Sequence, residues 1–216
     1  MNSPILQLLV LAGIAVFLIL RLRSVLGTRE GHEPTPEVRS AARPRQHNLE
    51  VIEGGPDRDI VDHVPEDSDS AAALAEMKRV EPSFGVADFL GGARGAYEMI
   101  LMAFERGEME EVRGFLSEDV YDSFEEVVAI REEKGLTIEA EFIGIRDMTL
   151  TSATFEDGVA SITVKFVGEL VSVVKDAEGN IIEGEPGKSK RQKDVWTFER
   201  MMGTDDPNWR LVATGE

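Results

Sequence analysis

The sequence contains no cysteine and only three histidines among its 216 residues. Without thiolates the chain cannot form disulfides, iron–sulfur clusters, zinc ribbons or a cysteine nucleophile. All three histidines, His32, His47 and His63, fall in a segment that we expect to be unfolded, so the predicted domain lacks imidazole acid–base chemistry. A phosphate-binding glycine motif and an H-E-x-x-H motif are also missing. We therefore expect a protein that is not an enzyme and that binds neither a metal nor a cofactor.

Positive charge is also scarce, because 23 basic residues face 41 acidic ones and the formal net charge is −18. Nucleic acid would be repelled by such a surface. Anionic lipid attracts clusters of lysine and arginine, so we also do not expect the folded domain to bind lipid headgroups strongly. Any attachment to a membrane would have to come from hydrophobicity.

Residues 4–26 supply that hydrophobicity. The run from Ile5 to Leu20 is uncharged, and Pro4 suits the first turn of a helix. It is short for a bilayer, which needs about 20 residues, but the helix can continue beyond Leu20 while Arg21 and Arg23 extend to the headgroups. We expect a retained transmembrane anchor at 4–26; the alternatives are a cleaved signal peptide and a soluble helix. The lack of a basic N-terminal region and of a small-residue cleavage site argues against the signal peptide.

The flanking charges predict the orientation of this anchor. Arg21 and Arg23 follow the apolar run, and basic residues stay on the cytoplasmic side of a membrane span. The N-terminus is neither Arg- and Ser-rich nor amphipathic, unlike a mitochondrial transit peptide. We therefore predict a single-pass protein of the bacterial cytoplasmic (inner) membrane, with the C-terminal domain in the cytoplasm.

Residues 27–80 are rich in proline and acids and poor in large apolar side chains. Such a composition cannot bury enough apolar surface to offset the entropy of ordering the chain. We predict an acidic disordered linker over 27–80, with a short helix over 71–80 at its end. The acidic cluster at 57–69 lacks the glycine and terminal glutamate of a calcium loop, and we expect it to be solvated.

From residue 81 to the end, the pattern is that of a folded domain. Apolar residues at steps of three and four predict a helix from Phe84 that ends near Gly107, and we expect another element to pack closely on its glycines Gly91, Gly92 and Gly95. A short helix follows, and Ser117 is a suitable N-cap for another helix that ends at Gly135.

After Gly135 the apolar period falls to two, which predicts about four antiparallel strands. The first strand changes phase near Gly144, as at a β-bulge, and Asp157-Gly158 is typical of a hairpin turn. Helices followed by a meander predict an α+β domain over 81–216, with the helices on one face of a curved sheet.

Several blocks of the chain resemble a known family. "FLGGARGAYEMILMAFERGEMEEVRGFLSEDVYDSFEEVV", "DVWTFER" and "PNWRLVAT" occur in the order found in the C-terminal domain of the Tim44 family, over roughly residues 84–216. This family includes the membrane tether of the mitochondrial protein-import motor and alphaproteobacterial homologues. The resemblance implies a cone-shaped fold like that of nuclear transport factor two, with an apolar pocket between helices and sheet. It also implies an adaptor role with chaperones, translocons or ribosomes.

Aromatic side chains are the candidate binding residues in this domain. They share positions on the apolar faces of predicted helices and strands, where they either fill the core or line a pocket for a lipid tail or a partner's side chain. The candidates are Phe89, Tyr97, Phe142, Phe166, Trp196, Phe198 and Trp209. Asp194 shares parity with Trp196 and could act as a base in a pocket, but we expect it at a solvated strand end. Tyr97 could stabilise an oxyanion in such a pocket, but its position in a helical apolar stripe favours a place in the core.

The function that these observations favour is that of a membrane-tethered adaptor. It would support protein translocation, folding or membrane-complex assembly at the cytoplasmic face of the bacterial inner membrane, with a DnaK-type chaperone as one candidate partner. The alternative is a domain that binds a lipid or another small apolar ligand and has no protein client. A degenerate isomerase-like enzyme using Asp194 is the third hypothesis.

Overall fold

The computed structural model describes residues 56–215 of the chain. The predicted anchor at 4–26, including Arg21 and Arg23, and the predicted linker up to residue 55 lie outside the described residues. Within 56–215, no helix has both the length and the hydropathy that crossing a membrane requires.

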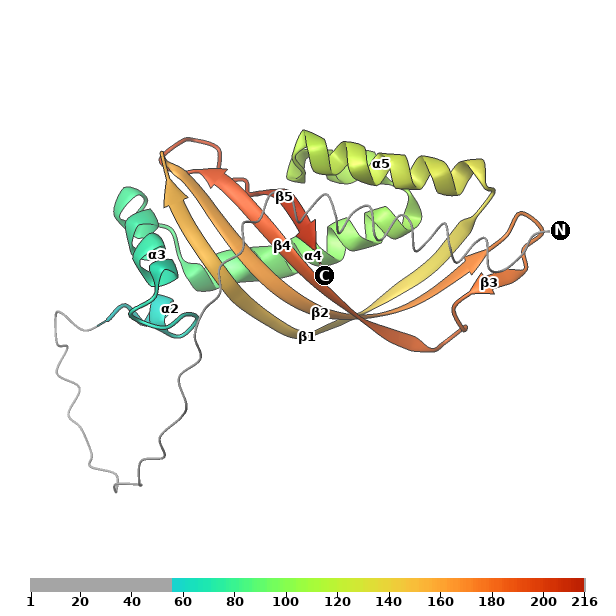
Figure 1. Cartoon of the computed structure of the whole chain (residues 1–216), viewed down its shortest axis with the longest axis horizontal. Coiled ribbons are helices and arrows are strands. Elements are labelled where there is room, and N and C mark those ends of the chain that lie inside the picture. Colours follow the sequence, from blue (N-terminus) through green and yellow to red (C-terminus); the bar gives the residue numbers. More distant parts are fainter. Residues whose placement is uncertain (1–55, 216) are drawn as a thin grey trace, which may run out of the picture. The chain divides into compact units, whose positions relative to one another are not determined.

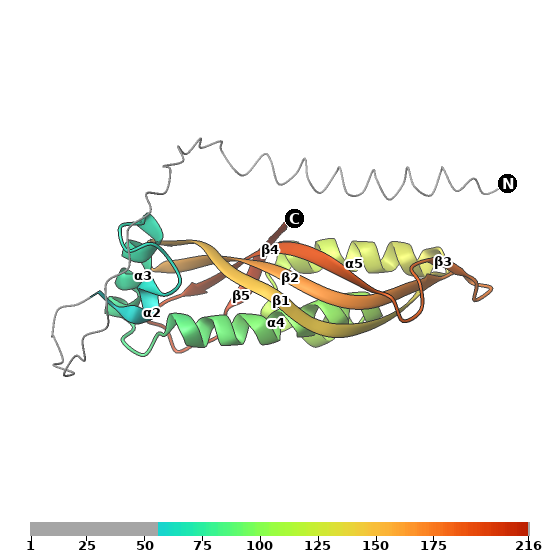
Figure 2. The same ribbon diagram turned by 90° about the horizontal axis from the view of Figure 1, so that it is seen from below.

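Helices precede strands along the chain, and the predicted α+β class is confirmed (Figure 1). The helical part consists of α2 (Arg58–Val61), α3 (Asp69–Val80), α4 (Val86–Arg106), the 3-10 helix η1 (Met109–Phe115) and α5 (Glu118–Glu133). The strands are β1 (Thr137–Glu156), β2 (Val159–Lys175), β3 (Ile181–Glu183), β4 (Ser189–Met201) and β5 (Arg210–Gly215). The sheet is curved, and α4 lies along its concave side (Figure 2).

The folded domain begins earlier than the sequence predicted. Residues 58–80, assigned to a disordered linker that ends in a short helix over 71–80, contain α2 and the whole of α3. The short helix is confirmed as part of α3, in which Leu74 and Met77 are fully buried. Ser68 caps α3 by accepting a hydrogen bond from the backbone N–H of Ala71 at 3.1 Å. The prediction of disorder was wrong for this part, because a narrow apolar stripe in a highly charged segment gains its stability from tertiary contacts.

The main helix, α4, has its N-terminus capped by a distant residue. Its own N-cap, Gly85, offers no side chain, and the carboxylate of Asp59 in α2 accepts hydrogen bonds from the N–H groups of Val86 (2.7 Å) and Ala87 (2.9 Å). The helix ends at Gly107, whose φ of 76° is the left-handed conformation that glycine adopts easily. The contact of Asp59 thus fixes the helical segment 58–61 to the start of α4.

The glycines of α4 do not have the role that the sequence suggested. Gly91, Gly92 and Gly95 are exposed, and an added Cβ at any of them would meet no atom within 4 Å. The expectation of a closely packed element at these positions was wrong for the described residues. They lie on the exposed side of α4, outside the buried stripe of Phe89, Ala93 and Tyr97.

The sheet has the order β1-β2-β4-β5, and the short strand β3 pairs with β2 outside this path. The predicted bulge is confirmed, because the β1–β2 register shifts between Phe142 and Gly144. The hairpin turn is also confirmed, since both Asp157 and Gly158 have positive φ values, 51° and 84°.

An aromatic core fills the space between α4 and the sheet. The Tyr97 ring stacks on Phe166 with the ring centroids 4.4 Å apart and the planes 10° apart, and Trp196 packs beside it at 4.8 Å. Nearer the start of α4, Phe89 contacts Trp209 at 4.6 Å. Edge and stacked contacts of this kind add to the energy of apolar burial and hold the helix in register with the sheet.

Candidate functional site: an acidic groove between η1 and α5

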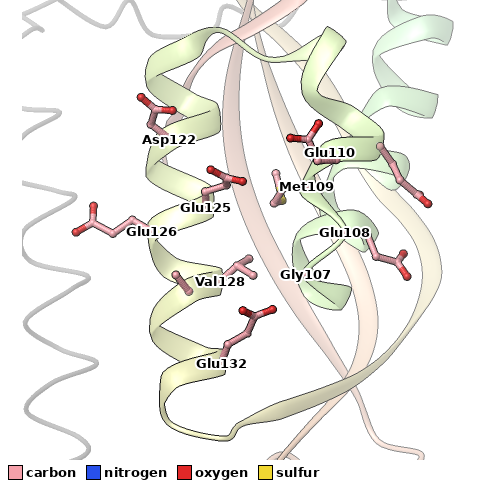
Figure 3. A pocket seen from close by; sticks show the side chains of 11 residues that line it. Gly107, Glu108, Met109, Glu110, Asp122, Glu125, Glu126, Val128 and Glu132 are labelled. Carbon is pink, nitrogen blue, oxygen red and sulfur yellow. The ribbon is translucent and has the colours of Figure 1, made fainter.

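A groove with a volume of about 770 Å³ runs between η1 and α5 (Figure 3). Its walls carry carboxylates, and its floor carries small or apolar groups. The lining residues are Gly107, Glu108, Met109, Glu110, Glu111, Asp122, Glu125, Glu126, Val128, Ala129 and Glu132. This is a surface feature made by consecutive elements, not a hollow in the aromatic core.

Two local signals place η1 and α5 on opposite sides of the groove. The left-handed Gly107 ends α4 and turns the chain into η1. Ser117 caps α5 by accepting from the N–H of Val120, and the Ser117 N–H donates to the Leu211 carbonyl at 2.9 Å. Along α5, Asp122, Glu125 and Glu126 recur at steps of three and four, so they share one face of the helix.

Most of the negative charge in the groove is not compensated within the described part of the chain. Of its seven carboxylates, only Glu108 and Glu110 form ion pairs there, with Arg106 at 3.9 Å and Arg113 at 3.2 Å. The remaining five are Glu111, Asp122, Glu125, Glu126 and Glu132. Like charges concentrated in a concave surface produce a local potential that attracts cations.

Tyr121 joins the two walls. Its hydroxyl lies 2.6 Å from Glu125 Oε1 and 3.0 Å from Glu110 Oε1, and the Arg113 guanidinium lies 4.5 Å from its ring centroid. The hydrogen bond to Glu125 is the main cause that raises the pKa of Tyr121 to about 12. A neutral phenol has one hydrogen to donate, so only one of the two carboxylates can receive it at a time.

The groove is suited to bind a basic, partly apolar segment. Carboxylates on both walls can pair with lysine or arginine, and Met109, Val128 and Ala129 can contact aliphatic carbons. The described residues contain no group of three or more histidine, aspartate or glutamate side chains arranged to hold a metal ion. The groove has no serine, cysteine or histidine that could serve as a nucleophile or base.

The seven aromatic residues singled out from the sequence are placed elsewhere. Five of them, Phe89, Tyr97, Phe166, Trp196 and Phe198, are buried, while Phe142 and Trp209 are half-buried against the same core. None lines the acidic groove, and none lines a second hollow of about 370 Å³ beside Arg200 and Arg210. A ligand-binding role for them stays a prediction.

The family profile described as Tim44-like domain matches residues 70–216. The chain belongs to the Tim44-like domain family. The matched range begins inside α3 and includes the groove, the aromatic core and every strand.

Similar proteins include the mitochondrial import inner membrane translocase subunit TIM44 of Homo sapiens, 24% identical over 148 residues, which are 67% of this chain and 33% of that protein. Subunit TIM44-1 of Arabidopsis thaliana is 21% identical over 160 residues, which are 71% of this chain and 34% of that protein. The chain thus spans about one third of the length of these relatives. Among solved structures, the intermembrane space region of the chloroplast protein ARC6 aligns with a TM-score of 0.40 at 12% identity, covering 58% of this chain and 94% of that one.

Asp194 of the Tim44-like domain does not lie where the sequence suggested. It was expected at a solvated strand end, but it is buried, and its carboxylate accepts hydrogen bonds from Tyr97 Oη at 2.5 Å and from Gln192 Nε2 at 3.0 Å. Burial first, and the hydrogen bond to Asp194 second, raise the pKa of Tyr97 well above its ordinary value. The pair links the middle of α4 to β4 inside the core.

Sequence reasoning did not identify the acidic groove of the Tim44-like domain. Its signal was present as two acidic patterns, "EMEE" at 108–111 and the acids of α5 from Asp122 to Glu132. Acids on the outer face of a helix normally mean only a solvated surface. The packing of η1 beside α5 is what turns the two patterns into one surface.

Proposed function

We propose that this Tim44-like chain is a non-enzymatic adaptor that is tethered to a membrane and binds protein partners during protein translocation, folding or membrane-complex assembly. The observation that carries the proposal is the family match over residues 70–216. The relatives named above are subunits of a mitochondrial inner-membrane import translocase, and they share with this chain only the region that corresponds to about one third of their length.

The groove supports a role in protein binding. Five carboxylates that form no ion pair within residues 56–215 stand above an apolar floor, and such a surface is suited to bind side chains. Charge complementarity at such a surface mainly raises the association rate and selects the partner. A basic segment that also carries apolar residues is the ligand chemistry that fits.

The N-terminal sequence supports a position at the membrane. The run from Ile5 to Leu20 is uncharged, and Arg21 and Arg23 follow it, so the positive-inside rule favours a cytoplasmic position for the domain. We propose the cytoplasmic face of the bacterial inner membrane as its site of action, with a DnaK-type chaperone among its partners. The acidic domain leaves membrane attachment to this apolar segment.

A photo-crosslinking amino acid at the exposed position Ala129, in the full chain in living cells, tests the adaptor role. We expect crosslinks to basic segments of proteins undergoing translocation or assembly, and we expect them to be lost when Glu111 and Glu126 are both changed to lysine. The same probe at Thr154, an exposed residue of β1 outside the groove, is the matched control. Equal partner yields from Ala129 and Thr154 would contradict the proposal.

The tether is tested separately in membrane fractions. We expect the full chain to stay with membranes after a carbonate wash and a chain without residues 1–23 to be released. A reagent restricted to the periplasm should leave residues beyond Arg29 unlabelled. Release of the full chain, or labelling beyond Arg29, would overturn the proposed location.

A further inference from the structure

The loop between β2 and β4 forms a hairpin tip with exposed apolar side chains. Its short strand β3 holds Ile181 and Ile182, which are 45% and 44% exposed and stand next to each other in the chain. Solvated aliphatic pairs at the end of a hairpin contribute nothing to the core of their own domain. They gain free energy only when another surface covers them.

The same tip concentrates positive charge in an otherwise acidic domain. The run "KSKRQK" supplies Lys188, Lys190, Arg191 and Lys193, all of which are exposed. Among residues 56–215, only Lys188 of these four forms an ion pair, with Glu185 at 3.0 Å. We call residues 181–193 the basic tip; it combines aliphatic groups with three cations that form no ion pair among residues 56–215.

The basic tip and the acidic groove have complementary chemistry. The groove offers five carboxylates without ion pairs above the apolar Met109, Val128 and Ala129. The tip offers cations without ion pairs beside two exposed isoleucines. No residue of the tip lines the groove of its own chain. One copy therefore displays both halves of an interface that it does not form within itself.

We propose that two copies of the chain pair, with the basic tip of each seated in the acidic groove of the other. This deepens the proposed function, because it names an occupant for the same protein-binding groove. The C-terminal end of α5, where the groove ends, lies close to the base of the tip: an added Cβ on Gly135, just after α5, would lie 3.1 Å from the Cβ of Ala177, just before the tip (Figure 1). Neighbouring complementary patches allow a closed two-fold pair in which both contacts form at once.

Net repulsion between two acidic chains does not prevent this contact. The formal charge of −18 is spread over the whole sequence. The Debye length is about 8 Å at physiological ionic strength, so charges in direct contact interact more strongly than distant ones. The apolar contact of Ile181 and Ile182 with the groove floor is insensitive to this screening.

The absence of native cysteine allows a direct test with the purified full chain in a mild neutral detergent. One preparation carries Ile182→Cys in the tip, and the other carries Ala129→Cys in the groove. Because each chain has a single thiol, a disulfide between the two variants must join two copies. We expect a covalent dimer on mild oxidation of the mixture, and we expect little dimer when Thr154→Cys replaces Ala129→Cys.

Charge reversal decides whether the two surfaces recognise each other. Lys188→Glu with Lys190→Glu in the tip chain should reduce the disulfide dimer roughly tenfold. Glu111→Lys with Glu126→Lys in the groove chain should do the same, and mixing the two reversed chains should restore it. Arg58→Glu with Arg94→Glu is the control for net charge and should leave the yield unchanged. Unchanged yield on tip or groove reversal, or equal yield with Thr154→Cys, would overturn the pairing without bearing on the cellular adaptor role.

Discussion

Gly168 in β2 leaves the space that the Tyr97 hydroxyl occupies. An added Cβ at this glycine would lie 2.5 Å from Tyr97 Oη and 3.1 Å from its Cε1. The hydroxyl cannot move away without weakening its hydrogen bond to Asp194 and its stacking on Phe166. This one position therefore couples β2 to the polar pair that holds α4.

Gly168→Ala should destabilise the fold by about 1–3 kcal/mol, as overpacking of a core typically does. Gly95→Ala is the matched control, because its Cβ would meet no atom within 4 Å on the exposed face of α4. That change should stabilise the chain by about 0.5–1 kcal/mol, since alanine is the better helix former. Urea unfolding followed by tryptophan fluorescence measures both effects. A cost for Gly95→Ala equal to that for Gly168→Ala would contradict this explanation.

Residue periodicity predicted which side chains share a face, but not the depth at which they lie. Asp194 has the parity of Trp196 and Phe198, so its direction toward the helices could be inferred from sequence. Its burial could not, because it depends on a hydrogen-bond donor 97 positions away, Tyr97. A carboxylate in a strand is normally at the surface, and only a distant partner makes the buried position tolerable.

At the scale of the elements, Asp59 of α2 stabilises the N-terminus of α4 by accepting hydrogen bonds from its first N–H groups. Partial burial acts to raise the pKa of Asp59, but hydrogen bonds from Lys78, Ala87 and Val86 outweigh it, so the pKa lies below its ordinary 3.8. Lys78 Nζ lies 2.7 Å from Asp59 Oδ2 and 2.7 Å from Asp57 Oδ2. An anion at a helix N-terminus also interacts favourably with the helix dipole.

Asp59→Asn should lower the free energy of unfolding by about 1 kcal/mol at neutral pH. Because the folded pKa is depressed, this contribution is full above the unfolded pKa and is lost as pH falls through the folded pKa. The difference between wild type and Asp59→Asn should therefore shrink below about pH 4. Denaturation curves across pH measure it, with the exposed Asp62→Asn as control. A difference that stays constant down to pH 2 would exclude the carboxylate as its source.

Elements whose signals are local in the sequence could be predicted, and elements that depend on contacts with distant residues could not. Helix α5 could be predicted from its own signals, since Ser117 caps it and acids occupy its first turn. The bulge at Gly144 and the turn at Asp157-Gly158 were equally local. Helix α3 was predicted only from residue 71, and the segment 58–70 was missed because its stabilising partners, such as the start of α4 for Asp59, are not adjacent in sequence.

At the scale of the whole molecule, composition predicted an acidic protein but not the distribution of its charge. The carboxylates of the groove and the cations of the basic tip come from separate segments, 107–132 and 181–193, and only the fold brings the end of α5 close to the base of the tip. A net charge averages over both surfaces. The proposed pairing of two copies therefore depends on these two opposed local charges and not on the total charge.

If the tip of a second copy and a basic partner segment use the same groove, they compete for it. Lys188→Glu with Lys190→Glu in the full chain should then increase partner crosslinks from a probe at Ala129 severalfold in cells. The reason is that fewer second copies then occupy the groove, which leaves it free for the partner. Crosslinks between copies from the same probe should fall in parallel. Arg58→Glu with Arg94→Glu changes the net charge equally and should alter neither yield. A fall in both partner and self crosslinks would instead show that the basic tip takes part in partner binding, and competition for the groove would be rejected.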